Sequence, residues 1–362
     1  MEAGLGICYK VIMTSSSGTI LSKNTVNNVG KILAKKNPGK IEIAYAIDML
    51  NRWRLCHAYP INTLKVTLRR KLQGFPAGYI VAQRLKRAPT IINKLQRYPD
   101  MQLFRMQDIG GLRAILDSVG NARKLEKIFK KSKFNHELAS SKDYIKEPKQ
   151  SGYRGIHLVY KYKNNKVPEY NGLLIELQIR TKLQHVWATT VETMGTFLGE
   201  ALKSSQGDKK WLDFFSLCSA AFSHIERTAP VPGFEGKTKA DIFKLVKEAE
   251  KDLNVLTKMD GFAVAANLIH NKKANKGSYY HLIILNSPAR TVRIVSFAKD
   301  KLKLATKEYA QAEKRIQKGE KIEAVLVSAG PLNSLRRAYP NYFLDTKDFS
   351  LLVKGKIISK VK

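Results

Sequence analysis

Residues 155–181 have the sequence GIHLVYKYKNNKVPEYNGLLIELQIRT, in which two apolar runs flank a polar one. The runs 155–162 and 173–179 are rich in branched and aromatic residues, which favour β-strands. The segment 163–172 between them contains the Asn, Pro and Gly residues that are typical of a turn. We therefore expect two strands here, and we interpret the rest of the chain outward from them.

Helical patterns, in which apolar residues recur every three to four positions, lie on both sides of these strands. We expect helices at residues 41–55, 61–72, 90–97, 122–131, 183–202 and 211–227. A further strand, 112–116, follows the Gly110–Gly111 pair. These elements predict an α+β core in which a mixed β-sheet is flanked by helices.

The two ends of the chain differ from this core. Residues 1–30 are rich in Ser, Asn, Gly and Thr, so we expect residues 1–79 to form a partly disordered and partly helical segment. The sequence APVPG at residues 229–233 predicts a boundary between a domain at 80–228 and a C-terminal domain at 234–362. The C-terminal domain is predicted to be a small α+β domain, with helices at 240–256, 302–316 and around 332–338, a hairpin of 279–285 with 291–297, and a strand at 322–327.

Composition indicates a globular protein without a membrane span. The chain has 362 residues, of which 44% are hydrophobic, and its apolar runs are far shorter than a spanning helix. We see no secretory signal in the mildly apolar start of the chain. The three cysteines, Cys8, Cys56 and Cys218, are too widely separated for a Cys-x-x-Cys metal site or a disulfide framework. This usage fits a reducing cytoplasm.

The charge is strongly positive: 64 Lys and Arg residues face 30 Asp and Glu residues, which gives a net charge of +34. The excess is spread along the chain, with +9 in residues 1–83, +12 in 84–228 and +13 in 229–362. Such an excess attracts polyanions, either nucleotides or nucleic acid. The alternative is a generally basic, solvated surface.

Two segments before and within the expected sheet carry groups that suit phosphate binding. Residues 84–90, RLKRAPT, place cations before and on the first turns of a helix, with Lys94 one turn further on. Residues 108–113, DIGGLR, place a carboxylate beside a glycine turn at the start of a strand, where a nucleotide-bound Mg²⁺ could be held. Taken singly, a solvated basic helix and an ordinary Asp-capped turn explain them as well.

Two later segments add a candidate acceptor site. Residues 143–157, DYIKEPKQSGYRGIH, combine Tyr, Lys, Arg and His around Pro and Gly, which suits a loop that stacks a base and binds phosphates. Residues 176–181, ELQIRT, place Glu176, Gln178 and Arg180 on one face of a strand by its alternation. That face is either a solvated sheet surface or the floor of a site.

In order and spacing, the four segments resemble the synthetase domain of the RelA/SpoT family over about residues 80–225. The resemblance implies a nucleotidyltransferase-like fold and the transfer of pyrophosphate from ATP to a ribose 3′-hydroxyl. It implies Mg²⁺ held by Asp108 and Glu176, with Glu176 also activating the hydroxyl. The implied ATP-binding residues are Arg84, Lys86, Thr90, Lys94 and Arg113. The implied acceptor-binding residues are Lys149, Tyr153, His157, Gln178 and Arg180, with the Tyr153 ring stacking on the acceptor and Lys149 and His157 contacting phosphate.

Two positions depart from the family's pattern: Gly155 stands where Ser is usual, and Arg87 is an additional cation. The sequence contains no His-Asp pair of the kind that the family's hydrolase domain carries, so no hydrolase activity is expected.

The resemblance leaves the acceptor open. GDP or GTP, giving (p)ppGpp, is the family's usual acceptor, whereas related toxins modify the 3′ end of tRNA and block translation, a reading that the +34 charge supports. A non-catalytic nucleotide- or RNA-binding regulator is the third reading. An antitoxin or another regulatory protein is a possible partner. Aromatic residues at 279–280 and 339–343 could stack on RNA or simply pack in the core.

Overall fold

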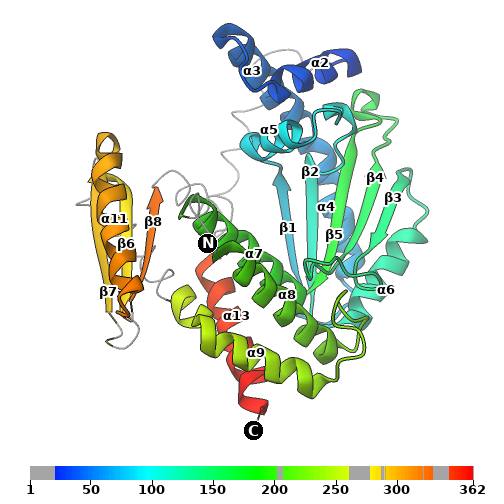
Figure 1. Ribbon diagram of the computed structural model, residues 1–362. Helices are drawn as coiled ribbons and strands as arrows, with labels where there is room; N and C mark the ends of the chain where they lie inside the picture. Colours follow the sequence, from blue (N-terminus) through cyan, green and yellow to red (C-terminus); the bar gives the residue numbers. More distant parts are fainter. Residues whose placement is uncertain are drawn as a thin grey trace, which may run out of the picture. The chain divides into compact units, whose positions relative to one another are not determined.

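The computed structural model describes residues 21–201, 207–260, 278–286, 289, 291–320, 322–328 and 342–361 (Figure 1). The chain divides into two compact units. Unit 1 comprises residues 1–114, 123–142 and 157–179, and unit 2 comprises 115–122, 143–156 and 180–362. Over the described ranges, no helix has the length and apolar character that a membrane span requires.

A five-stranded sheet, most of which belongs to unit 1, has the strand order β1-β2-β5-β4-β3 (Figure 1). Its strands are β1 (Ile80–Leu85), β2 (Gly110–Leu116), β3 (Glu137–Asp143), β4 (Ile156–Lys161) and β5 (Leu174–Thr181). β5 lies in the middle of the sheet, and all of its residues after the first are buried. The three strands expected from the sequence, β2, β4 and β5, are confirmed as the central ones. The strands β1 and β3 were not predicted, because edge strands need little apolar sequence.

Four of the five helices described in the N-terminal half agree with the predicted ones to within a few residues, and the first of the five had no predicted range. They are α2 (Lys23–Ala34), α3 (Lys40–Cys56), α4 (Ala58–Leu72), α5 (Ala88–Arg97) and α6 (Val119–Lys130). The helix α2 falls inside the segment predicted to be partly disordered, and it begins where the Ser22 hydroxyl accepts a hydrogen bond from the Thr25 amide. Residues 1–20 lie outside the described residues. The buried faces of α2, α3 and α5 meet in one core, which includes Leu33, Leu50 and Leu95.

Unit 2 contains the long helices α7 (Lys182–Ala201), α8 (Gly207–Glu226), α9 (Lys239–Leu253) and α13 (Tyr342–Lys356). It also contains a three-stranded sheet of order β7-β6-β8, with α11 (Leu302–Gln317) packed on it (Figure 1). The strands β6 (Ser278–Asn286), β7 (Thr291–Ala298) and β8 (Ile322–Ser328) pair antiparallel, with Ile283 opposite both Ile294 and Val325. The predicted hairpin and its following helix and strand are therefore confirmed.

One expectation for the C-terminal half is not tested, and one helix there was not predicted. The predicted helix around 332–338 lies outside the described residues, as does part of the hairpin turn. The helix α13 had no sequence prediction, because its apolar residues are distributed around the helix and form no single stripe. Single-turn 3₁₀ helices occur at Leu103–Arg105, Pro168–Tyr170, Lys299–Lys301 and Ile358–Lys360.

One hydrophobic core joins α7 and α8 to α9 and α13, and it crosses the predicted boundary at residues 229–233. Phe214 and Phe222 of α8 and Phe349 of α13 are buried in it, and so is Val231, which lies between the two prolines of the boundary sequence. The two compact units have other bounds than the predicted domains 80–228 and 234–362, which stay a prediction. Pro and Gly here mark a turn whose central side chain is buried.

Candidate active site

In unit 1, two lysines surround the carboxylate of Asp108. Lys86 follows β1, and its amide donates a hydrogen bond of 2.8 Å to the carbonyl oxygen of Ile109. The Lys86 ammonium forms an ion pair with Asp108 Oδ2, and Lys94 Nζ of α5 lies 3.4 Å from Asp108 Oδ1. Burial raises the pKa of Asp108, but the two lysines outweigh burial and the net pKa is lowered. The carboxylate is therefore charged, with two cations beside it.

A residue that the sequence did not single out fixes the backbone of this lysine. Arg54 of α3 donates from Nε to the Lys86 carbonyl oxygen at 2.7 Å, and from Nη1 to Asn51 Oδ1 at 2.8 Å. Burial lowers the pKa of the Arg54 guanidinium. Nothing in the helical pattern of residues 41–55 distinguishes this arginine from a solvated one, so only the fold reveals its contact with Lys86.

Glu176 lies on β5, and its side chain is held by two neighbours. His157 Nδ1 of β4 is 2.7 Å from Glu176 Oε1, and Gln178 Nε2 donates to Oε2 at 2.8 Å. Burial raises the pKa of Glu176, and so does the negative charge of Asp108. The hydrogen bonds from His157 and Gln178 outweigh both effects, so the pKa is lowered overall. Asp108 lies just before β2 and Glu176 on β5, and these two strands are neighbours in the sheet. The polar face predicted for residues 176–180 is thus a buried floor, because Glu176 is only 8% exposed and Gln178 9%.

Arg113 and Arg84 complete the predicted set in unit 1. Arg113 of β2 donates from Nε to Gln178 Oε1 at 3.4 Å, which connects it to the Glu176 floor. Arg84, near the end of β1, lies beside Gly111, where a Cβ would stand 4.0 Å from Arg84 Cγ. Thr90, in the first turn of α5, is exposed.

In unit 2, cations and a second aromatic ring surround the ring of Tyr153. Arg180 donates from Nη2 to Tyr153 Oη at 2.8 Å, and its guanidinium carbon lies 5.1 Å from the ring centroid. Lys149 Nζ lies 5.4 Å from the same ring centroid and 4.6 Å from that of Tyr144. The two tyrosine rings meet edge to face, with centroids 5.6 Å apart. A half-buried ring between cations can stack a base next to phosphate-binding groups.

The loop that carries Tyr153 has a defined backbone. The Asp143 carboxylate accepts hydrogen bonds from the amides of Ile145 at 3.1 Å and Lys146 at 3.0 Å, as in an Asx turn. Gly152 has φ +86°, and a Cβ there would stand 2.8 Å from Ser219 Cβ of α8. Gly155, where the family usually has Ser, has φ +153°, a value that residues with a side chain rarely adopt.

The described residues contain no group of three or more His, Cys, Asp or Glu side chains arranged to hold a metal ion. Asp108, just before β2, and Glu176, on the neighbouring strand β5, offer two carboxylates, and Lys86 and Lys94 beside Asp108 are cations suited to phosphate. This donor set fits Mg²⁺, which proteins commonly bind through one or two carboxylates together with substrate phosphates and water. The Lys86 ammonium would have to give up its contact with one Asp108 oxygen when a metal binds there.

Each of the two units thus holds a group of polar side chains from the predicted segments, and the comparisons with known proteins concern the same part of the chain. Residues 83–195 match the family model described as the region found in RelA/SpoT proteins, so this part of the chain is a RelA/SpoT region. The GTP pyrophosphokinase YjbM of Bacillus subtilis (strain 168) is 37% identical over 112 residues, which cover 30% of this chain and 52% of YjbM.

Two further relatives complete the comparison. The GTP pyrophosphokinase YwaC of the same organism is 30% identical over 112 residues, 29% of this chain and 52% of YwaC. The chain thus spans about half the length of these two curated relatives. Among solved structures, small alarmone synthetase 1 from Bacillus subtilis bound to its product pppGpp is 26% identical, and the match covers 49% of this chain and 93% of that chain with a TM-score of 0.43.

Proposed function

We propose that this protein is a pyrophosphokinase that transfers the pyrophosphate of ATP to the ribose 3′-hydroxyl of GDP or GTP, forming (p)ppGpp. One observation carries the proposal: the buried Glu176 carboxylate is held by His157 Nδ1 at 2.7 Å and by Gln178 Nε2 at 2.8 Å, on a strand next to the one that Asp108 precedes. The RelA/SpoT region and the names of the two curated relatives support the same class of reaction. We expect no accompanying hydrolase activity.

The donor half of the site would hold the ATP phosphates. Lys86, Lys94 and Arg113 supply fixed positive charge around the carboxylates, and Arg84 and Thr90 lie at the end of β1 and the start of α5. Asp108 and Glu176 would hold Mg²⁺, which when bound neutralises charge on the phosphates.

In the transfer, the 3′-oxygen of the acceptor forms a bond to the β-phosphorus of ATP, and the bond from that phosphorus to the α–β bridging oxygen breaks. AMP leaves with the electron pair of that bond. Glu176 would take the proton of the hydroxyl as general base, and His157 and Gln178 hold its carboxylate in place for this step.

The acceptor half would use the loop of residues 143–157. The Tyr153 ring would stack on the guanine base, while Lys149, His157 and Arg180 would contact the acceptor phosphates. Gln178 would orient Glu176 and Arg113 at the junction of donor and acceptor.

In the test, the protein is incubated with Mg²⁺, ATP labelled in its γ-phosphate, and either GDP, GTP or bulk tRNA, and the molecule that receives the label is identified. We expect the label on the guanosine nucleotide, AMP in equal amount, and loss of transfer when EDTA removes the metal. Label on the tRNA 3′ end would show that the proposed acceptor, GDP or GTP, is wrong. Tight nucleotide binding with label on neither acceptor would refute the proposed enzymatic activity and favour a non-catalytic, nucleotide-binding regulator.

A further inference from the structure

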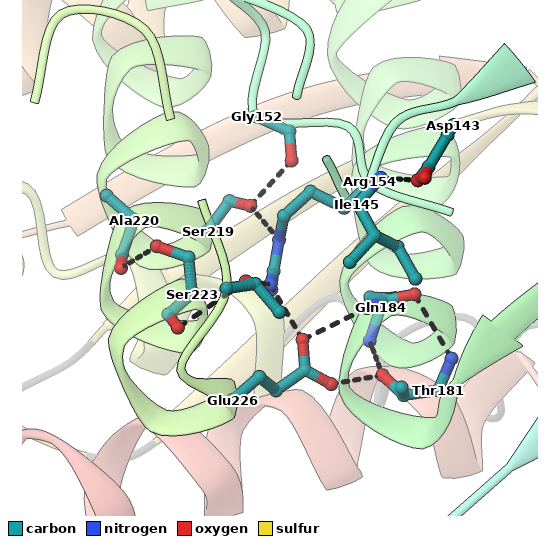
Figure 2. Close-up of polar contacts among 11 residues, drawn as sticks. Asp143, Ile145, Gly152, Arg154, Thr181, Gln184, Ser219, Ala220, Ser223 and Glu226 are labelled. Atoms are coloured by element: carbon teal, nitrogen blue, oxygen red, sulfur yellow. Dashed lines mark hydrogen bonds and ion pairs between the residues drawn. The ribbon is translucent and has the colours of Figure 1, made fainter. Parts of the chain in front are cut away.

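A buried arginine follows directly after the candidate stacking tyrosine. Arg154 is 1% exposed, and its guanidinium contacts three residues of α8 and the turn after it (Figure 2). Nε donates to Ser219 Oγ at 3.2 Å, and Nη1 donates to Glu226 Oε2 at 2.7 Å and to Thr228 Oγ1 at 3.2 Å. Ser219 in turn donates to the Gly152 carbonyl oxygen at 2.5 Å. The loop on both sides of Tyr153 is thereby tied to α8.

The same Glu226 holds a second segment, which begins directly after Arg180. The hydroxyl of Thr181 donates to Glu226 Oε1, and Gln184 Nε2 donates to Oε2 at 3.1 Å (Figure 2). Thr181 and Gln184 are also joined to each other, since each backbone amide donates to the other residue's side-chain oxygen at 3.1 and 3.2 Å. One carboxylate at the end of α8 therefore connects the residue after Tyr153 with the residue after Arg180.

The buried Arg154–Glu226 ion pair contributes little to the free energy of folding. Burial lowers the pKa of Arg154, while Glu226 raises it, and removing two charges from water offsets most of what their attraction contributes. A pair of well-packed apolar side chains would hold the same elements together as firmly. What an ion pair with directional hydrogen bonds adds is a fixed geometry at its two ends. Those ends adjoin Tyr153 and Arg180, which contact each other through a hydrogen bond of 2.8 Å.

We propose that Glu226 is a positioning residue for the acceptor: it sets the distance and orientation between Tyr153 and Arg180 without touching the acceptor itself. The inference rests on the proposed function, because it takes the Tyr153–Arg180 pair as the acceptor-binding pair. Glu226 lies beyond residues 83–195, where the family model matches, so the match assigns it no role.

The first experiment measures the geometry independently of activity. In Glu226→Gln we expect about tenfold faster hydrogen exchange at the amides that close the two segments. In the first segment, the Lys149 amide donates to the carbonyl oxygen of Tyr153, and the Gly152 amide donates to that of Lys149. In the second segment, the amides of Thr181 and Gln184 each donate to the side chain of the other residue. The amide of Lys86, which donates to Ile109 O in unit 1, should exchange at its original rate.

The second experiment separates positioning from loss of folded protein. We expect the KM for GDP to rise about tenfold to a hundredfold, because small displacements of substrate-binding groups have large effects, while the KM for ATP changes less than about twofold. A variant that is merely less folded would lower kcat and leave both KM values unchanged. Thr181→Val removes the hydrogen bond to Glu226 and the one accepted from the Gln184 amide, but it keeps the Arg154–Glu226 pair, so it should shift the GDP KM in the same direction by a smaller factor.

Glu126→Gln is the matched control. The Glu126 side chain is 11% exposed, against 7% for Glu226, and it pairs with Arg123 at 2.9 Å and Lys130 at 2.7 Å, but it lies on α6, outside both segments. It should change neither the exchange rates nor the KM for GDP.

The proposal is overturned if folded Glu226→Gln keeps the wild-type exchange at the two segments, or if both KM values rise equally. If the wild type transfers pyrophosphate to no acceptor, the proposed function fails, and the affinity for GDP measured by calorimetry replaces its KM. In that case, faster exchange at the two segments of Glu226→Gln together with weaker GDP binding still supports the positioning role. Faster exchange with unchanged GDP binding refutes it.

Discussion

Glu176 shows how a buried carboxylate keeps its charge. It is 8% exposed, and burial alone would favour its protonated form. The hydrogen bonds from His157 and Gln178 reverse this, and the resulting pKa lies below the ordinary value of 4.5. A general base has to be deprotonated before it can accept a proton, so this pKa suits the role that we assign to Glu176.

We predict that Glu176→Gln lowers kcat by about 10²- to 10⁴-fold, while nucleotide binding is retained. Since the base acts in its deprotonated form and its pKa is lowered, the rate should decline only as pH falls below 4.5, and Glu176 should cause no change in rate near neutral pH. Steady-state rates across pH and equilibrium titration with GDP test both statements. Glu169→Gln, an exposed glutamate in the turn before β5, should leave kcat unchanged. Activity retained in Glu176→Gln would refute the assigned base.

At the scale of elements, the loop of residues 143–156 depends on one glycine. Gly152 combines φ +86° with a close approach to α8, where a Cβ would meet Ser219 Cβ at 2.8 Å and Ser216 Cα at 3.1 Å. Real Cβ atoms do not approach this closely, so any side chain at this position moves the loop away from the helix. Tyr153 is the next residue, and it would move with the loop.

We predict that Gly152→Ala destabilises the protein by about 2–4 kcal/mol and weakens GDP binding. Gly172→Ala provides the comparison, because Gly172 has φ +90° with nothing near its missing Cβ, so it isolates the cost of the backbone conformation at about 1 kcal/mol. Urea unfolding and GDP titration of both variants measure the difference. Equal destabilisation by the two substitutions would contradict the steric part of the argument.

The elements that the sequence predicted are those with strong local patterns. The apolar runs around His157 and Glu176 predicted the central strands, and helical spacing predicted α3, α5 and α11. The edge strands β1 and β3 lacked such a pattern, since all of their residues are exposed or half-buried. The predicted division into domains stays a prediction, and the core around Val231 includes residues on both sides of the predicted boundary.

At the scale of the whole molecule, the net charge of +34 is distributed over the entire chain. Proteins with such an excess bind nucleic acid through the phosphate backbone, and that binding releases counterions and depends steeply on salt. In our proposal the acceptor is a mononucleotide, so RNA binding is a consequence of charge and carries no specificity for a tRNA end.

We predict that affinity for tRNA falls on the order of a thousandfold between about 50 mM and about 200 mM salt, if about six phosphates are contacted. A single-stranded RNA of matched length should bind equally well and show the same slope. Filter binding across a salt series provides the measurement. A preference for the intact tRNA 3′ end that survives high salt would instead favour tRNA as the acceptor.

The sequence by itself determined the central strands, most helices and the four segments that carry the candidate site, because alternation, helical spacing and residue type are local properties. Only the tertiary structure decided which residues meet. Arg54 contacts Lys86 from 32 positions away, and Arg154 pairs with Glu226 across 72 positions. Neither pair leaves a periodic signal, because a buried ion pair depends on how distant elements pack and not on the spacing of residues within one element.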